Sequence, residues 1–250
     1  MNKKIFVLIY QIFAISLLFC INPQRDYFNQ ISFIKDLGNN FSISEIGSVS
    51  YNNISYPVSK ITYNPNSNNK NRYLVLCGVH GNEPAPVLAI SNFLQSINNT
   101  MVNINNPCVD FIYIINPWGF TFNQRTNGIN IDINRDITTQ LSQESKLLRE
   151  AINIKSYSHV FDFHEGNTSG YYLYYYNKKQ SSISERIIDI YKDSKVPLEN
   201  EYTDVILQAK EGVIFVPWYA KEYMKSKKTV TTTLWTYDNG IESSFTIETS

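Results

Sequence analysis

Short apolar runs alternate along the chain with longer stretches in which apolar residues recur every three or four positions. The apolar, β-branched and aromatic runs predict strands over residues 42–50, 56–63, 73–77, 111–115, 160–163, 171–176, 229–233 and 244–248. The helical spacing predicts helices over residues 84–94, 143–154 and 183–194. Strands that alternate with helices are typical of an α/β domain, and 250 residues fit one large domain.

Two of the predicted strands end beside histidines. The strand over residues 73–77 is followed by His80 and Glu83 at the turn into a helix, and a later strand leads directly into His164. Because α/β enzymes place their chemistry at the carboxyl ends of strands, these side chains are candidates for one site. His159 is an odd number of residues from His164, which predicts the opposite face of the strand and either a structural role or an exposed position.

These residue types predict a metal centre. A catalytic zinc ion needs two or three imidazole or carboxylate ligands and one position left open for water. His80 and Glu83 offer two ligands from a single turn, and His164 offers a third from another strand end. The sequence therefore predicts one zinc ion per chain. The alternative interpretation of the first pair is a capped helix start with an incidental histidine.

The end of the chain resembles a known family. Residues Trp235 to Glu248 are similar to the segment W-x-Y-D-x-G-I-x-x-S-F-T-x-E of the zinc metallocarboxypeptidases of the carboxypeptidase A type. Further signatures of that family follow in the same order along the chain: His80 and Glu83, then Asn116, Pro117 and Gly119, then Arg125, then Asp132, Asn134 and Arg135, then His164. The resemblance spans residues 43–248 and implies an α/β fold with a mixed central sheet of about eight strands flanked by helices.

The resemblance also implies a task for each matching residue near the metal. His80, Glu83 and His164 would bind zinc, and the metal would lower the pKa of its water toward neutrality. Asp132 would accept a hydrogen bond from the outer nitrogen of His80 and so orient that ring. Glu248 would act as the general base that takes a proton from the water and passes it to the leaving amine.

Other residues would handle the substrate in the same scheme. Arg125 would stabilise the oxyanion, while Asn134 and Arg135 would bind the terminal carboxylate of the substrate. The residue fifteen positions before the general base sets specificity in the larger enzymes, and here it is Thr233, which supports neither charged preference. The alternative for the charged side chains is an ordinary solvated loop with surface ion pairs.

The implied activity is that of a metallocarboxypeptidase, which removes a C-terminal amino acid from a peptide, with a cell-wall peptide as one candidate. The interval from Arg125 to Asn134 is short and similar to the compact branch near succinylglutamate desuccinylase and aspartoacylase, so an amidohydrolase of N-acyl amino acids is a second interpretation. The chain ends two residues after Glu248, where relatives continue into a helix. A minimal or truncated domain is therefore expected, and an inactive zinc-binding domain is a third interpretation.

The start of the chain predicts export. Met1 to Lys4 precede the apolar residues 5–21, the pattern of a secretory leader over residues 1–21, ahead of a catalytic domain over residues 40–250. Residues 17–20 resemble a lipoprotein signal, so membrane attachment through a lipidated Cys20 stands beside simple cleavage near residues 20–25. The expected location is periplasmic, secreted or lipid-anchored in the cell envelope.

The charge of the chain indicates which kinds of binding partner to expect. The chain has 22 basic and 22 acidic residues and no long basic run, so nucleic acid is not an expected partner. The expected partner is a peptide or N-acyl amino acid substrate. Cys77 and Cys108 lie in or beside predicted strands and are expected to be buried hydrophobic residues, although export would allow them to pair.

Overall fold

The computed structural model describes residues 25–99, 107–204, 206–241 and 243–249. The predicted leader over residues 1–21, with Cys20, lies outside this range. Within the described residues, no helix is both long enough and apolar enough to cross a membrane.

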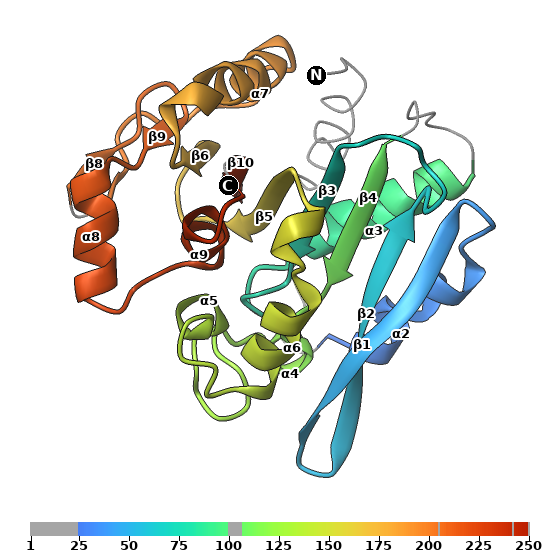
Figure 1. Cartoon of the computed structure of the whole chain (residues 1–250). Coiled ribbons are helices and arrows are strands. Elements are labelled where there is room, and N and C mark those ends of the chain that lie inside the picture. Colours follow the sequence, from blue (N-terminus) through green and yellow to red (C-terminus); the bar gives the residue numbers. More distant parts are fainter. Residues whose placement is uncertain (1–24, 100–106, 205, 242, 250) are drawn as a thin grey trace.

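An eight-stranded mixed sheet forms the centre of the molecule (Figure 1). Its strands are β1 (Phe41–Tyr51), β2 (Ile54–Tyr63), β3 (Arg72–Cys77), β4 (Cys108–Tyr113), β5 (His159–Glu165), β6 (Tyr172–Tyr175), β9 (Val213–Phe215) and β10 (Ser243–Thr249). The order across the sheet is β1-β2-β4-β3-β5-β10-β6-β9. The four central strands β4, β3, β5 and β10 run parallel to one another, and so do β6 and β9. The pairings β1-β2, β2-β4 and β10-β6 are antiparallel. The predicted mixed eight-stranded α/β fold is confirmed.

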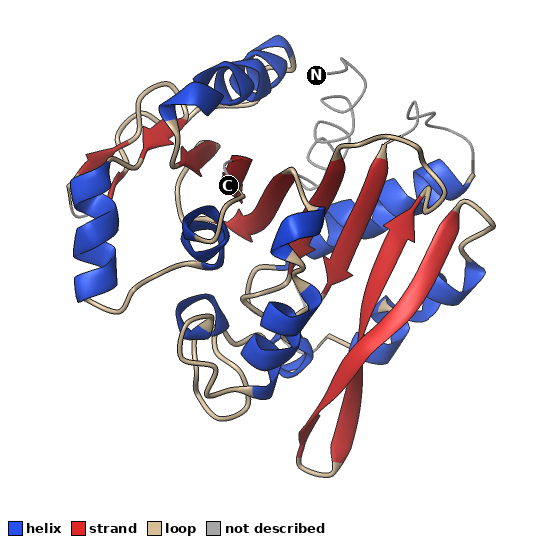
Figure 2. Cartoon of the chain, viewed as in Figure 1, coloured by secondary structure: helices blue, strands red, loops and turns tan. Residues whose placement is uncertain are grey.

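Helices cover both faces of this sheet (Figure 2). The helices are α2 (Tyr27–Gln30), α3 (Pro84–Asn98), α4 (Pro117–Phe122), α5 (Ile133–Asp136), α6 (Gln143–Ala151), α7 (Ser181–Asp193), α8 (Trp218–Ser226) and α9 (Thr232–Asp238), with short 3-10 turns at Ser32–Asp36, Ile154–Ser156 and Lys178–Gln180. Apolar side chains of α2, α3 and α7 pack on one face, and those of α5, α6 and α9 pack on the other. The central strands are apolar on both faces because both faces are covered.

One predicted element is wrong. The β-branched run over residues 229–233 predicts a strand, but α9 begins inside it at Thr232. The hydroxyl of Thr231 accepts a hydrogen bond from the backbone N–H of Leu234 at 3.1 Å, which caps the helix. A threonine that satisfies an unpaired N–H at a helix start favours the helix over the strand that its side chain otherwise prefers. The small hairpin of β7 (Thr203–Asp204) and β8 (Leu207–Gln208) is not predicted either.

His159 and the two cysteines Cys77 and Cys108 are buried in the structure. His159 is buried and stacks on Tyr73 with ring centroids 5.0 Å apart, and burial lowers the pKa of His159 to about 4. Cys77 and Cys108 are buried free thiols. They lie at opposite ends of the parallel strands β3 and β4, where Cys77 is opposite Tyr113 and Cys108 is opposite the first residue of β3, so they cannot pair with each other.

Candidate metal centre

The predicted site residues converge at one edge of the sheet. The strands β3, β5 and β10 are parallel neighbours in the order β3-β5-β10, so their carboxyl ends lie side by side (Figure 1). The loop after β3 carries His80 and Glu83, while His164 and Glu248 lie near the ends of β5 and β10, directly opposite each other in the strand register. Residues far apart in the sequence are thus placed together by sheet topology alone.

Glycines shape the loop that carries the first two candidate ligands. Gly78 follows β3 with φ of +67°, a left-handed conformation that turns the chain away from the sheet. Gly81 touches the backbone of α4, because a Cβ atom built on Gly81 would lie 1.9 Å from the carbonyl carbon of Gly119. A side chain at position 81 would push the loop off α4. The helix α3 then begins at Pro84, whose fixed φ suits the first helical position.

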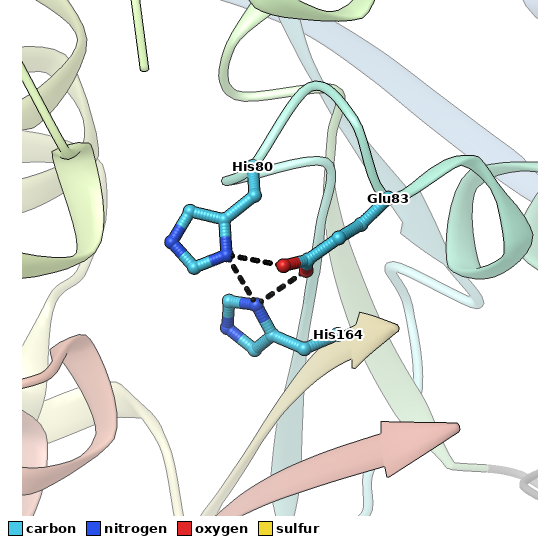
Figure 3. Close-up of side chains that lie close together, drawn as sticks. All are labelled: His80, Glu83 and His164. Atoms are coloured by element: carbon cyan, nitrogen blue, oxygen red, sulfur yellow. Dashed lines mark hydrogen bonds and ion pairs between the residues drawn. The ribbon is translucent and has the colours of Figure 1, made fainter. Parts of the chain in front are cut away.

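The side chains of His80, Glu83 and His164 point at one another (Figure 3). His80 Nδ1 lies 2.7 Å from Glu83 Oε1, His164 Nδ1 lies 2.8 Å from Glu83 Oε2, and the two Nδ1 atoms are 3.1 Å apart. Ligands that hold a tetrahedral zinc ion at about 2.0–2.1 Å are roughly 3.3 Å from one another. The donor types and their spacing therefore fit a metal ion bound between the two imidazoles and the carboxylate.

The electrostatics of this cluster favour a cation. Burial alone would raise the pKa of Glu83, but the neighbouring His164 and His80 outweigh it and hold that pKa well below its usual range. Burial would lower the pKa of His164, yet Asp162 and Glu83 raise it well above the ordinary value. A site that stabilises an extra proton on a buried imidazole also stabilises a metal cation in its place.

The Nε2 atom of each imidazole lies near the carboxylate of an aspartate. His80 Nε2 lies 3.1 Å from Asp132 Oδ1, the contact predicted for that residue. His164 Nε2 lies 3.2 Å from Oδ2 of Asp162, which is fully buried. The second contact is close enough for an ion pair, although neither oxygen of Asp162 has an aligned hydrogen-bond partner among the described residues. Such carboxylates fix the tautomer and orientation of a ligating histidine.

Asp162 is a site residue that the sequence interpretation missed. It belongs to an apolar run that predicts a strand, and its charge drew no attention there. The signal was the alternation itself, since residues two apart in a strand share a face. Asp162 and His164 therefore both point to the α9 side of the sheet, while Phe161 and Phe163 belong to the opposite apolar layer.

Arg125 lies at the rim of the cluster. Its Nη1 is 3.3 Å from Glu83 Oε1 and its Nε is 3.1 Å from Asp132 Oδ2, with 45% of the side chain exposed. Asn116 holds the backbone in place: its amide donates to the carbonyl of Arg125 at 3.3 Å, and its oxygen caps α4 by accepting from the N–H of Gly119. The side chain of Asn116 thus connects α4 with the backbone that carries Arg125.

A cavity of about 450 Å³ opens beside the cluster. It is lined by His80, Glu83, Arg125, Asn134, Arg135 and Glu248 at the metal end, and by Tyr172, Tyr174, Tyr176, Tyr202, Leu207, Val216, Met224, Thr231 and Thr246 elsewhere. All the candidate metal ligands except His164 line the cavity directly. Tyr172, Tyr174 and Tyr176 belong to a run that predicts only a strand from sequence, because their convergence on the cavity depends on distant residues such as Tyr202 and Thr231.

The two predicted carboxylate-binding residues differ in their surroundings. The Nη1 atom of Arg135 is buried and has no hydrogen-bond partner among the described residues. Asn134 is buried, its Oδ1 accepts from the N–H of Thr232 at 2.8 Å, and its Nδ2 lies 3.5 Å from Nε2 of His164. Arg135 also lines the cavity, and Asn134 ties α5 to α9.

Glu248 has a half-buried carboxyl group whose pKa is raised. Burial raises its pKa, and the nearby carboxylates of Glu83 and Asp162 raise it further, while His164 and His80 act in the opposite direction. A carboxyl group with a raised pKa is a stronger base once it has lost its proton. That change suits a residue that must accept a proton near neutral pH.

Comparisons with known proteins identify a matching family and similar folds. A model of the succinylglutamate desuccinylase/aspartoacylase catalytic domain matches residues 69–213. No curated protein matches the chain. Solved structures that resemble it include a protein assigned to the metallopeptidases from Shewanella denitrificans OS217, with 17% identity, coverage of 93% of this chain and 90% of that one, and a TM-score of 0.71.

Two carboxypeptidase structures are also similar. A metallo-carboxypeptidase from Burkholderia cenocepacia has 15% identity, coverage of 89% of this chain and 58% of that one, and a TM-score of 0.61. Bovine thrombin-activatable fibrinolysis inhibitor, in complex with tick carboxypeptidase inhibitor, has 16% identity, coverage of 90% and 86%, and a TM-score of 0.66. At these identities the likeness establishes a shared fold. Because the family model covers more than half of the chain, the protein belongs to the succinylglutamate desuccinylase/aspartoacylase family, with a metallocarboxypeptidase-like fold.

Proposed function

We propose that this hydrolase is a zinc-dependent metallocarboxypeptidase that removes the C-terminal amino acid from a peptide. The observation that carries the proposal is one cavity that joins a metal-type cluster, a carboxyl group suited to act as a base, and the guanidinium group of Arg135. These three features are what hydrolysis next to a free carboxylate requires.

The division of labour follows from the positions of the side chains. His80, Glu83 and His164 would hold the zinc ion, which supplies Lewis acidity that polarises a carbonyl and acidifies water. Glu248 would take a proton from the attacking water and deliver it to the leaving amine. Arg125, half-exposed at the rim, would donate to the carbonyl oxygen as negative charge develops on it.

Recognition of the substrate would depend on Arg135. Its guanidinium group lines the cavity and can bind a terminal carboxylate with a charge-assisted hydrogen bond. The end of the cavity near Thr233 is neutral: this buried hydroxyl contacts the hydroxyls of Tyr176 and Thr246. We therefore propose a leaving residue with an uncharged side chain.

Deacylation of an N-acyl amino acid is the second candidate, and the family match favours it. Both reactions release an amino acid that carries a free carboxylate, so Arg135 and Glu248 would serve either one. They differ in what lies on the other side of the scissile amide, a peptide or a small acyl group. The products of the reaction therefore separate the two candidates.

Metal analysis tests the first step. The purified protein should contain about one zinc ion per chain, and a chelator should remove both metal and activity, with recovery when zinc is added back. Absence of metal after mild purification, combined with no uptake from zinc-containing buffer, would contradict the proposed centre. Zinc binding without hydrolysis of any peptide or N-acyl amino acid would indicate an inactive zinc-binding domain.

Product analysis tests the choice of reaction. The panel contains peptides with free C-termini, the same peptides amidated, cell-wall peptides and N-acyl amino acids. A carboxypeptidase releases the terminal residue from the free peptides and leaves the amidated ones intact. Arg135→Ala should weaken use of free peptides by about ten- to a hundredfold, the loss expected for one charge-assisted contact. Release of an acyl acid, with all peptides untouched, would select the deacylase instead.

Export remains part of the proposal. It depends on the charged and apolar pattern of residues 1–21, which lie outside the described structure. Fractionation of producing cells, with sequencing of the mature N-terminus and a mass measurement for lipid on Cys20, tests it. A full-length protein found in the cytoplasm would overturn this part and leave the proposed chemistry unaffected.

A further inference from the structure

Arg25 reaches the outer side of the loop that carries two proposed metal ligands. Its Nη1 donates to the carbonyl of Gly81 at 2.7 Å and to the carbonyl of Phe120 at 3.3 Å. Its Nη2 donates to Oδ1 of Asn123 at 2.8 Å, and its backbone N–H donates to the carbonyl of Thr121. One side chain thus connects the loop after β3 with α4 and the residue that ends it.

These contacts occur where the two backbones touch. Gly81 lies against Gly119 with no space for a side chain, so the loop and α4 meet through their peptide groups. The carbonyls of Gly81 and Phe120 both accept from the same guanidinium nitrogen. Without that donor, two carbonyl dipoles would face one another across the junction and lose a charge-assisted hydrogen bond each.

We propose that Arg25 is a positioning residue for the metal centre. Gly81 lies between His80 and Glu83, so any shift of its carbonyl moves both ligands. The other end of the contact, α4, leads through Asn123 toward Arg125. The inference rests on the proposed metal site, and it adds that the geometry of this site depends on a residue outside the segments that carry the ligands.

Arg25 is itself held in place by the element that follows it. Tyr27 in α2 is buried, its hydroxyl donates to the carbonyl of Pro57 in β2, and its ring packs edge-on against Tyr56 with centroids 5.6 Å apart. The Arg25 guanidinium also lies 5.2 Å from the centre of the Phe120 ring. Because Tyr27 anchors the segment independently, removal of the Arg25 side chain should leave the segment docked.

The test compares Arg25→Ala with Arg149→Ala in the full chain. Arg149 is a matched control: it is also half-buried, lies 5.3 Å over the Trp235 ring and donates to the carbonyl of Thr138, but it has no contact with the metal loop. Zinc affinity is measured by competition with a chromophoric chelator, and unfolding is followed on the metal-free proteins. Arg25→Ala should lose about tenfold in zinc affinity, the loss typical of a group that orients a ligand, while Arg149→Ala keeps wild-type affinity.

Two further measurements separate positioning from a general folding defect. Excess zinc should restore most of the kcat of Arg25→Ala, and the metal-free variant should unfold at the same urea concentration as the metal-free wild type, which a folding defect would not allow. Arg25→Lys, which keeps the charge and one donor for Gly81, should have intermediate affinity, and it is the deciding variant if Arg25→Ala does not fold. Wild-type affinity in the deciding variant overturns the role of Arg25 while the metal site stands. A wild-type protein that binds no zinc overturns the metal site itself.

Discussion

The metal edge of the sheet and the tyrosine wall of the cavity are built in different ways. The metal edge consists of the carboxyl ends of β3, β5 and β10, three neighbouring parallel strands. The tyrosine wall, formed by residues 172–176, 202–204 and 206–231, contains strands of four residues or fewer and a helix, α8, of which only Ala220 is buried. At the metal edge His80, Glu83 and His164 each contact at least two other polar side chains. In the wall Tyr172 and Tyr176 are buried, but the helix α8 is mostly exposed.

This contrast links local packing to function. His164 is 1% exposed and contacts ligands or carboxylates on both ring nitrogens, whereas Trp218 and Tyr219 on α8 are 72% and 51% exposed. A buried, multiply bonded site holds a metal ion at fixed geometry. A helix with one buried residue, such as α8, can change its position more easily than the strands of the metal edge. We therefore expect substitutions at the metal edge to affect chemistry and metal binding, and substitutions in the wall to affect substrate affinity.

The largest expected effect is that of Glu248→Gln. The amide keeps the shape of the side chain but cannot accept the proton from water, so kcat should fall by about a hundredfold or more. Zinc content should remain at the wild-type level, because Glu248 is outside the proposed ligand set. Steady-state kinetics and metal analysis on the same sample check both parts. Wild-type turnover by this variant would show that Glu248 does not act as the general base.

Asp162→Asn should have the next largest effect. The neutral amide no longer supports the imidazole of His164 electrostatically, and zinc affinity should fall by about ten- to a hundredfold. Asp110→Asn is the matched control, since Asp110 is also a fully buried aspartate of the central sheet but bonds to Arg72 and Tyr157. Chelator competition should show weaker zinc binding for the first variant alone. Equal affinities would mean that Asp162 only contributes to folding.

The metal edge was largely predictable from the sequence, for a physical reason. His80, Glu83 and His164 each follow a strand signal, and parallel strands place their ends together without any knowledge of side-chain packing. The alternation of strands and helices predicted an α/β domain, while the mixed sheet of about eight strands was implied by the resemblance to the metallocarboxypeptidases. Asp162 was missed because a charged residue inside an apolar run was interpreted only as part of a strand.

The wall was not predictable for a different reason. Its cavity depends on contacts between segments separated by tens of residues, such as the hydrogen bond between Tyr176 and Thr233. Local preference even misled, because threonine at 231–233 favours a strand until Thr231 caps α9. The contact of Arg25 with Gly81 belongs to the same class, since 56 positions separate the two residues.

The pH dependence of stability tests a buried carboxylate away from both regions. Burial would raise the pKa of Asp110, but hydrogen bonds from Arg72, Thr62 and Tyr157 outweigh it and lower that pKa below its ordinary value. A depressed folded-state pKa stabilises the protein above the unfolded value of about 4, and this contribution is lost as pH falls through the folded value. Urea unfolding of the wild type should therefore show falling stability below about pH 4.

Asp110→Asn should reduce stability by about 1–2 kcal/mol at neutral pH, through the loss of charge-assisted hydrogen bonds. The difference between the variant and the wild type should shrink as the pH falls below 4, because the wild-type carboxyl is then neutral as well. Unfolding curves at several pH values measure this difference. A difference that is constant across that range would show that the charge on Asp110 contributes nothing to stability.

The smallest expected effect, and the sharpest separation of the two regions, comes from Thr231→Ala in the wall. The substitution removes the hydroxyl that caps α9 and contacts Tyr176, so the free energy of unfolding should fall by about 1 kcal/mol. Because Thr231 lines the cavity but lies outside the proposed ligand set, KM should rise while zinc affinity stays unchanged. Thr231→Ser, which retains the hydroxyl, should behave like the wild type in both measurements. Weaker zinc binding in the alanine variant would show instead that the wall and the metal edge form one cooperative unit, coupled through the contact of Asn134 with Thr232.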